Sequence, residues 1–130
     1  MPQNDSKLWN VFSLYIRLRD VDESGFGKCF TCFNQVNYRK GDCGHGIPRQ
    51  HKATKYNEQN NHLQCKRCNG FEGGKREVYK EEVNKRYGPQ TWEKLEVMSR
   101  TTCKRGQFEI NILTEHYKKE VEKLRKLKGL

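Results

Sequence analysis

Two Cys-x-x-Cys pairs constrain this chain more than any other feature of its sequence. Cys29 and Cys32 form the first pair, Cys65 and Cys68 form the second, and 32 residues lie between the two pairs. Four thiolates at this spacing are typical of a closed, tetrahedral structural zinc site. The alternative is two redox pairs of the thioredoxin type, but the strand–helix–strand pattern that accompanies such pairs is missing. The sequence therefore predicts one structural Zn²⁺ bound by these four cysteines.

The composition explains why a chain of this length would need a metal. Only 33% of its 130 residues are hydrophobic, and a short chain buries a small share of its surface, so a metal or a partner subunit is expected to add stability. No apolar run approaches the roughly 18 residues of a membrane span, and the N-terminus lacks a secretory signal pattern. The expected location is the cytoplasm, with no membrane partner.

The net charge of +10 favours an anionic partner, and nucleic acid is the usual one for a small basic protein. The excess is concentrated in residues 28–76, which carry ten Lys/Arg against three Asp/Glu. Each of these cations taken alone can be a plain solvated charge, but as a group they predict phosphate contacts with DNA. The candidates are Arg17 and Arg19, which precede this segment, and Arg49, Lys52, Lys55, Lys66 and Arg67 within it.

Hydrophobic periodicity predicts an α+β chain with three segments: an N-terminal helix and turn (1–27), a zinc-binding core (28–74) and a C-terminal helical region (75–130). Helices are expected at 6–19, near 65, and at 75–87, 90–101 and 107–128, with short β pieces in 28–47 and no clear period in 48–64. The longest helix carries a stripe that fits packing on the domain or on a second subunit. That stripe comprises Ile110, Leu113, Tyr117, Val121, Leu124 and Leu127.

The order of the polar motifs resembles the zinc-stabilised HNH, or ββα-metal, nucleases, including phage endonuclease VII. Along the chain come a CxxC pair, a Gly-His step ending at His45, then Asn60, and then a CxxCN run that ends at Asn69. The resemblance implies a small, treble-clef-like core in which His45 is the general base. Asn60 would brace the loop, and Asn69 would bind a divalent metal.

A closer resemblance covers most of the chain. Residues 9–20 read WNVFSLYIRLRD, residues 42–45 read DCGH, residues 60–69 read NNHLQCKRCN, and a Tyr-Gly turn follows at 87–88. This series is similar to the lambdoid phage NinG/Rap recombination family. The resemblance implies an endonuclease that acts on branched DNA such as Holliday junctions and D-loops. Because resolving a junction takes two cuts, a homodimer is expected.

The residue types suit phosphodiester hydrolysis. Histidine is the side chain whose ordinary pKa suits a base near neutral pH, and an amide oxygen is a hard ligand for Mg²⁺ or Mn²⁺. Many HNH enzymes carry Asp or His just before the base, whereas this chain has Gly44. Asp42 is the nearest carboxylate and a candidate second ligand, and His62 is a candidate for the metal or a phosphate. The simpler readings are an Asx turn for Asp42 and a helix cap for Asn69.

Three functions remain open from the sequence. The leading one is a metal-dependent, structure-selective endonuclease. The second is a non-catalytic, zinc-containing DNA-binding module with a degenerate HNH site, which Gly44 motivates. The third is a protein-interaction adaptor that docks through the long C-terminal helix.

Overall fold

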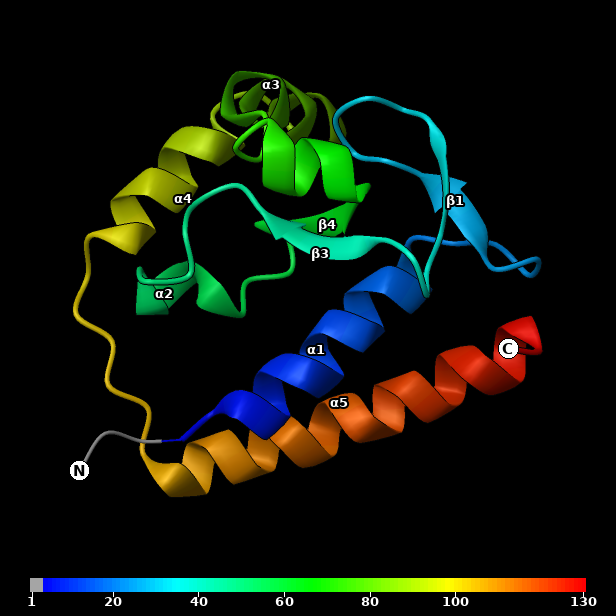
Figure 1. Ribbon diagram of the computed structural model, residues 1–130. Helices are drawn as coiled ribbons and strands as arrows, with labels where there is room; N and C mark the ends of the chain where they lie inside the picture. Colours follow the sequence, from blue (N-terminus) through cyan, green and yellow to red (C-terminus); the bar gives the residue numbers. More distant parts are fainter. Residues whose placement is uncertain (1–3) are drawn as a thin grey trace.

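The computed structural model describes residues 4–130, which form an α+β fold of helices around two small sheets (Figure 1). The elements follow one another as α1 (Ser6–Arg19), β1 (Phe26–Lys28), β2 (Gln35–Asn37), β3 (Asp42–His45), α2 (Lys52–Lys55), β4 (Asn61–Gln64), η1 (Arg67–Phe71), α3 (Arg76–Tyr87), α4 (Thr91–Ser99) and α5 (Gln107–Lys128).

Both sheets are antiparallel pairs. β1 pairs with β2, and β3 pairs with β4 in a register that sets His45 opposite Asn61 and Asp42 opposite Gln64. No hydrophobic period predicted the strand β4, because all four of its residues are buried and three of them are polar. A strand buried on both faces has no alternation of polar and apolar residues to reveal it.

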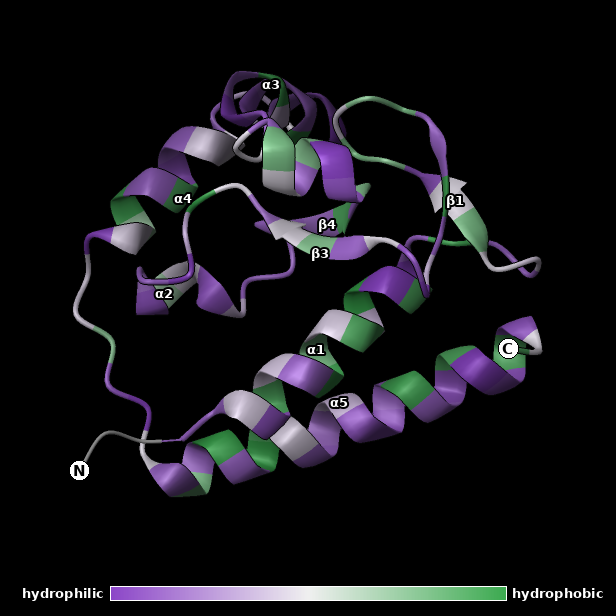
Figure 2. Ribbon diagram, in the orientation of Figure 1, coloured by the Kyte–Doolittle hydropathy of each residue, from purple (hydrophilic) through white to green (hydrophobic). Residues whose placement is uncertain are grey.

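The amphipathic helices predicted at 6–19 and 107–128 are confirmed as α1 and α5, and the two pack side by side (Figure 1). Hydrophobic and hydrophilic residues alternate along α5 (Figure 2). Phe12 of α1 meets Tyr117 of α5 edge to face, with ring centroids 4.9 Å apart. The apolar stripe of α5 is therefore covered by α1 of the same chain, except for Leu127, which is exposed. This packing removes the stripe as a reason to expect a second subunit or a docked partner.

The helix predicted near residue 65 is only one turn, η1, which ends at Phe71. Gly73 and Gly74 then adopt φ values of +61° and +84°, a left-handed conformation that glycine tolerates best. This turn separates η1 from α3. The predicted helices at 75–87 and 90–101 are confirmed as α3 and the slightly shorter α4.

The three predicted segments share their hydrophobic cores. One cluster contains Phe12 from the first segment, Cys43 and Tyr56 from the second, and Ile110 and Tyr117 from the third. The zinc-binding segment is therefore held between helices from both ends of the chain. None of the helices in residues 4–130 combines the length and the apolar character that a membrane crossing requires.

The aromatic contact between α1 and α5 generates a stability prediction. Phe12 is fully buried, so Phe12→Ala should lower the free energy of unfolding by about 3–5 kcal/mol. Phe108 lies on α5 and is 79% exposed, so Phe108→Ala should change it by less than about 0.5 kcal/mol. Urea denaturation of the two variants measures the difference, and equal effects would contradict the packing of α1 on α5.

Candidate functional site

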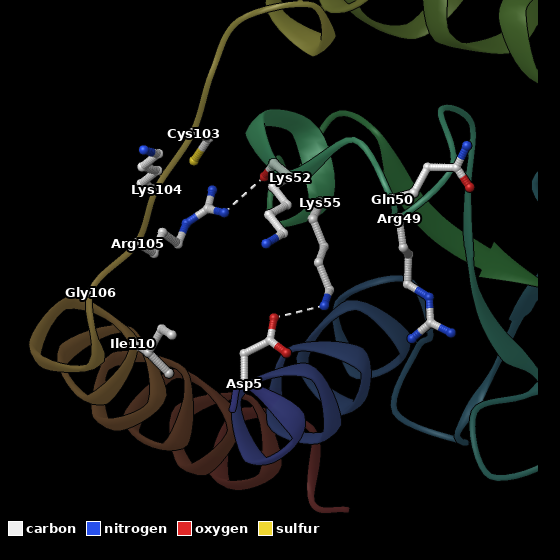
Figure 3. Close-up of a pocket in the computed structure, with 10 residues that line it drawn as sticks. All are labelled: Asp5, Arg49, Gln50, Lys52, Lys55, Cys103, Lys104, Arg105, Gly106 and Ile110. Atoms are coloured by element: carbon white, nitrogen blue, oxygen red, sulfur yellow. Dashed lines mark hydrogen bonds and ion pairs between the residues drawn. The ribbon is translucent and has the colours of Figure 1, made fainter. Parts of the chain in front are cut away.

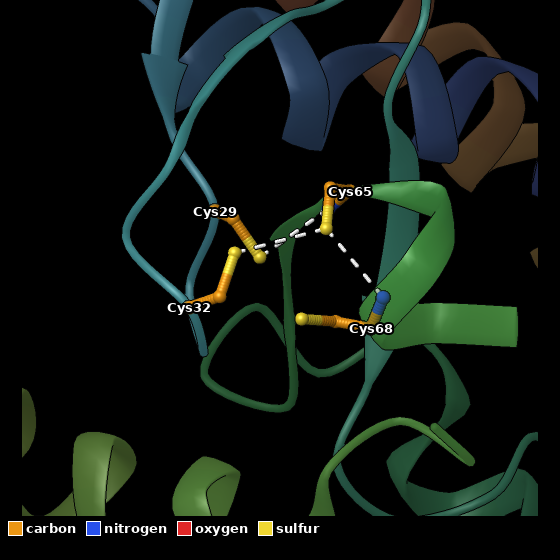
Figure 4. Close-up of side chains that lie close together, drawn as sticks. All are labelled: Cys29, Cys32, Cys65 and Cys68. Carbon is orange, nitrogen blue, oxygen red and sulfur yellow. Dashed lines mark hydrogen bonds between the residues drawn. The ribbon is translucent and has the colours of Figure 1, made fainter. Parts of the chain in front are cut away.

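The four cysteines of the two CxxC pairs come together in space (Figure 4). All four Sγ atoms lie within 4.8 Å of one another, and those of Cys32 and Cys65 are 3.8 Å apart. A tetrahedral zinc ion with Zn–S bonds of about 2.3 Å needs sulfur atoms about 3.8 Å apart. The four side chains can therefore hold a zinc ion, as their spacing predicted.

Backbone N–H groups already point at the sulfur atoms. The N–H of Cys65 donates to Sγ of Cys29 at 3.3 Å, and the N–H of Cys68 donates to Sγ of Cys65 at 3.5 Å. Burial raises the pKa of Cys29, but hydrogen bonds from backbone N–H groups outweigh it and lower that pKa to about 6. Such hydrogen bonds favour the thiolate, which is the form that binds a metal.

The other two cysteines, Cys43 and Cys103, lie outside the cluster. Cys43 is on β3, where burial raises its pKa to about 12, and its Sγ lies 3.7 Å from Oδ1 of Asn61. Cys103 is half-buried in the connection between α4 and α5. Neither thiol takes part in the four-cysteine group.

A pocket of about 440 Å³ brings three of the predicted catalytic residues together. Asp42 and His45 enter it from the two ends of β3, and Asn69 enters from η1. Two of the predicted phosphate-binding cations also line it. The full lining is Trp9, Ser13, Arg17, Gly41, Asp42, Cys43, His45, Arg49 and Asn69.

His45 has a ring nitrogen without a partner. Its Nδ1 is buried and makes no hydrogen bond with any residue in 4–130. Burial, together with the positive charges of Arg49 and Arg76, lowers the pKa of His45 to about 4. The imidazole is thus neutral at neutral pH. Arg76 is therefore a neighbour of His45, and its Nε donates to the carbonyl of Gly46 at 3.0 Å. The sequence did not predict this role, because nothing near Arg76 in the chain distinguishes it from the other cations.

Asp42 and Asn69 are direct neighbours. Nδ2 of Asn69 donates to Oδ2 of Asp42 at 3.1 Å, and Nζ of Lys66 lies 2.7 Å from the other carboxylate oxygen. Carboxylate and amide oxygens are the ligands that Mg²⁺ prefers, and this ion commonly keeps several water ligands. The carboxylate of Asp42 and the amide of Asn69 therefore offer oxygen atoms of the kind that such a cation binds.

Gly44 is dictated by packing. A Cβ atom at this position would overlap Oε1 of Gln64. The Gln64 side chain is held in place because its Nε2 donates to Oγ1 of Thr31 at 3.0 Å and to the carbonyl of Gly74 at 3.1 Å. The position before His45 therefore has no room for the metal ligand that many HNH enzymes carry there.

Asn60 is fully buried and holds the loop that follows His45. Its Oδ1 accepts a hydrogen bond from the N–H of Ile47 at 2.8 Å. Its Nδ2 donates to the carbonyls of Ile47 at 3.1 Å and Thr54 at 3.3 Å. This is the contact pattern expected of a loop brace.

His62 lies in the core rather than in the pocket. It is fully buried and stacks on Phe30 with ring centroids 3.8 Å apart. Its Nδ1 is 2.9 Å from the hydroxyl of Tyr79, and its Nε2 is 2.7 Å from that of Tyr87. Burial and the charges of Arg19 and Arg86 lower its pKa to about 2. The expected contact with a metal or a phosphate is therefore wrong, because both nitrogens are used inside the fold.

Arg19 is also a structural residue, which corrects its assignment to phosphate contacts. It forms an ion pair with Asp20 at 2.7 Å, and its guanidinium donates to the carbonyls of Glu58 at 3.0 Å and Asn61 at 2.8 Å. Its side chain therefore holds α1 against β4.

The other predicted cations reach the surface to different degrees. Arg17 lines the His45 pocket while one of its NH groups donates to the carbonyl of Tyr38. Arg49 and Lys52 are exposed and make no ion pair within the described chain. The remaining cations form the ion pairs Lys55–Asp5, Lys66–Asp42 and Arg67–Glu72.

The cysteine cluster generates a metal prediction. Purified protein should contain one zinc ion per chain, and a Cys65→Ser/Cys68→Ser variant should lose it, because two thiolates cannot complete a tetrahedral site. Cys103→Ser is the matched control and should keep the zinc. Elemental analysis measures the ratio, and zinc retained by the double variant would contradict the four-cysteine site.

Comparison with known proteins gives one match. No curated protein and no solved structure matches this chain. The family model described as "Bacteriophage Lambda NinG protein" matches residues 3–128. That range covers nearly the whole chain, including both CxxC pairs and every residue of the His45 pocket. The chain therefore belongs to the NinG family.

Proposed function

We propose that this protein is a metal-dependent DNA endonuclease that cuts branched recombination intermediates such as Holliday junctions and D-loops. One observation carries the proposal. His45, whose Nδ1 makes no hydrogen bond within residues 4–130, lines a pocket that also contains Asp42, Asn69 and two arginines. A base, hard oxygen ligands and cations are the groups that phosphodiester hydrolysis requires in one place.

The order of the elements supports an HNH-type site. β3 carries His45 at its end, a long loop braced by Asn60 follows, β4 returns antiparallel, and η1 supplies Asn69. This is the strand–strand–helix order of the ββα-metal nucleases that the sequence resembles. The four cysteines that would hold the zinc lie in the connection between β1 and β2, directly after β4, and in η1.

Each residue then has a defined task. Neutral His45 accepts a proton from the water that attacks the phosphorus, and Arg17 and Arg49 balance the charge that grows on the phosphate oxygens. A divalent cation held by Asp42 and Asn69 would stabilise the scissile phosphate and the leaving oxygen. Asn60 keeps the loop after His45 from moving, so that the imidazole stays oriented.

The preference for branched DNA and the dimer rest on separate grounds. The branched substrate follows from the resemblance to the NinG/Rap family. With the α5 stripe covered by α1, the homodimer is proposed only because two cuts are needed to resolve a junction.

Removing the proposed base tests the function. His45→Ala should lower the rate of Mg²⁺-dependent nicking of a four-way junction by about 10²–10⁴-fold, and DNA binding should be retained. His116→Ala, on the exposed side of α5, is the matched control and should cut like the wild type. The assay compares a labelled junction with a linear duplex made of the same arms.

Binding without cutting by the wild type in Mg²⁺ and Mn²⁺ would favour the second candidate function, a DNA-binding zinc module. The observation that favours it is the Gln64 side chain, which fills the space where the Asp or His before the base would lie. Unchanged cutting by His45→Ala would instead reject His45 as the base.

Asp42 provides a test of the metal site. Asp42→Asn keeps the shape of the side chain but removes its charge, so the Mg²⁺ concentration for half-maximal cutting should rise at least about tenfold. Asp22→Asn is the control, because Asp22 lies in the exposed turn before β1 and bonds Ser24. A metal titration of cutting by both variants makes the comparison, and equal midpoints would exclude Asp42 as a ligand.

A further inference from the structure

A second and larger pocket, of about 820 Å³, lies beside the His45 pocket. It is enclosed by α2, by the connection from α4 to α5, and by the beginnings of α1 and α5 (Figure 3). Five of its ten lining residues are cations and one is acidic. The lining consists of Asp5, Arg49, Gln50, Lys52, Lys55, Cys103, Lys104, Arg105, Gly106 and Ile110.

Aromatic rings hold several of these cations in place. The guanidinium of Arg49 lies 4.5 Å from the ring centroid of Trp9, and that of Arg105 lies 5.2 Å from the centroid of Tyr56. The ammonium of Lys55 lies 5.4 Å from the same Tyr56 ring. Cations placed over aromatic faces are attracted to them, so these charges are positioned before any ligand arrives.

The positive charge of the pocket is mostly uncompensated. Asp5 is its single acid, and that carboxylate is already engaged by Nζ of Lys55 and by the hydroxyl of Tyr56, both at 2.7 Å. The other four cations form no ion pair with residues of the described chain. Arg105 donates one hydrogen bond, to the carbonyl of Lys52 at 2.8 Å, which fixes the connection against α2 without neutralising it. The pocket is therefore complementary to an anion.

The two pockets are connected through one residue. Arg49 lines both the large pocket and the His45 pocket. A ligand that contacts both must carry repeated negative charges along its length, and the sugar–phosphate backbone of DNA has this property.

We propose that the large pocket binds the phosphate backbone of a DNA arm next to the phosphate that lies at His45, with Lys104 and Arg105 as contact residues. This inference rests on the proposed function, because it takes the His45 pocket as the place where the scissile phosphate binds. It extends the DNA-binding surface from the zinc-binding segment to the connection between α4 and α5. Lys104 and Arg105, which lie in that connection, were not among the phosphate contacts predicted from the sequence.

The test compares two neutralised Lys/Arg pairs for binding of a labelled four-way junction at a series of salt concentrations. Lys104→Gln/Arg105→Gln should weaken binding and reduce the slope of log affinity against log salt by about one to two, because each phosphate contact contributes about 0.9. Arg125→Gln/Lys126→Gln removes the same two residue types from an exposed site near the far end of α5 (Figure 1). This control should leave the slope unchanged. Unfolding curves verify that both variants are folded.

Measuring binding in the His45→Ala background keeps this test separate from the test of cutting. If the nuclease proposal fails, the wild type does not nick the junction. That result leaves the slope of log affinity against log salt unaffected, so the two proposals have separate readouts. Equal slopes for the two double variants would overturn the inference. The thermal stability of both double variants is also measured with and without ATP. If the slope for DNA is unchanged in Lys104→Gln/Arg105→Gln but a stabilisation by ATP is lost, the inference is overturned, because the pocket then binds small polyphosphates instead of DNA.

Discussion

The cluster formed by the side chains of Cys29, Cys32, Cys65 and Cys68 is the constraint on which the rest of the structure depends. It ties the loop after β1 to the end of β4 and the start of η1. Two further contacts follow the same path: the N–H of Phe30 donates to the carbonyl of Leu63 at 2.9 Å, and Gln64 donates to Thr31. Because Asn69 follows Cys68 directly, fixing this cysteine also fixes the distance from Asn69 to Asp42. The four-cysteine cluster and the candidate site are therefore parts of one arrangement.

A buried polar network centred on Tyr79 supports the strand that carries His45. The hydroxyl of Tyr79 lies 2.9 Å from His62, 2.9 Å from the carbonyl of Gly44 and 3.1 Å from that of Asn60. Buried polar groups are costly unless each finds a partner, and here two of the partners are the carbonyls of Gly44, which precedes His45 in β3, and of Asn60, which precedes β4. The network thus fixes the strand that carries the proposed base, while Nδ1 of His45 makes no hydrogen bond within the described residues.

Much of the site could be predicted because its signals are local. The CxxC spacing indicated the candidate metal ligands, and the resemblance to HNH nucleases indicated His45 and Asn69. Asp42 was added as the carboxylate nearest to His45 in the sequence, and the fold brings these three residues to one pocket. His62 and Arg19 were misassigned because a histidine or an arginine can bind a metal or a phosphate, but can equally be a hydrogen-bonded residue inside the fold. Only burial and partners distinguish these roles. The large basic pocket was not predicted, since Arg49 and Arg105 come together from segments 56 positions apart in the chain.

The sequence by itself determined the helices α1 and α5, the four-cysteine cluster and the order of the HNH-like motifs, because periodicity and ligand spacing are properties of short stretches. The tertiary structure decided which face of α5 is covered, why residue 44 must be glycine, and where the cations gather. It also separated His45, which lines a pocket, from His62, which is enclosed by aromatic rings. The physical reason is that burial and pairing depend on residues far apart in the chain, which only the folded chain brings into contact.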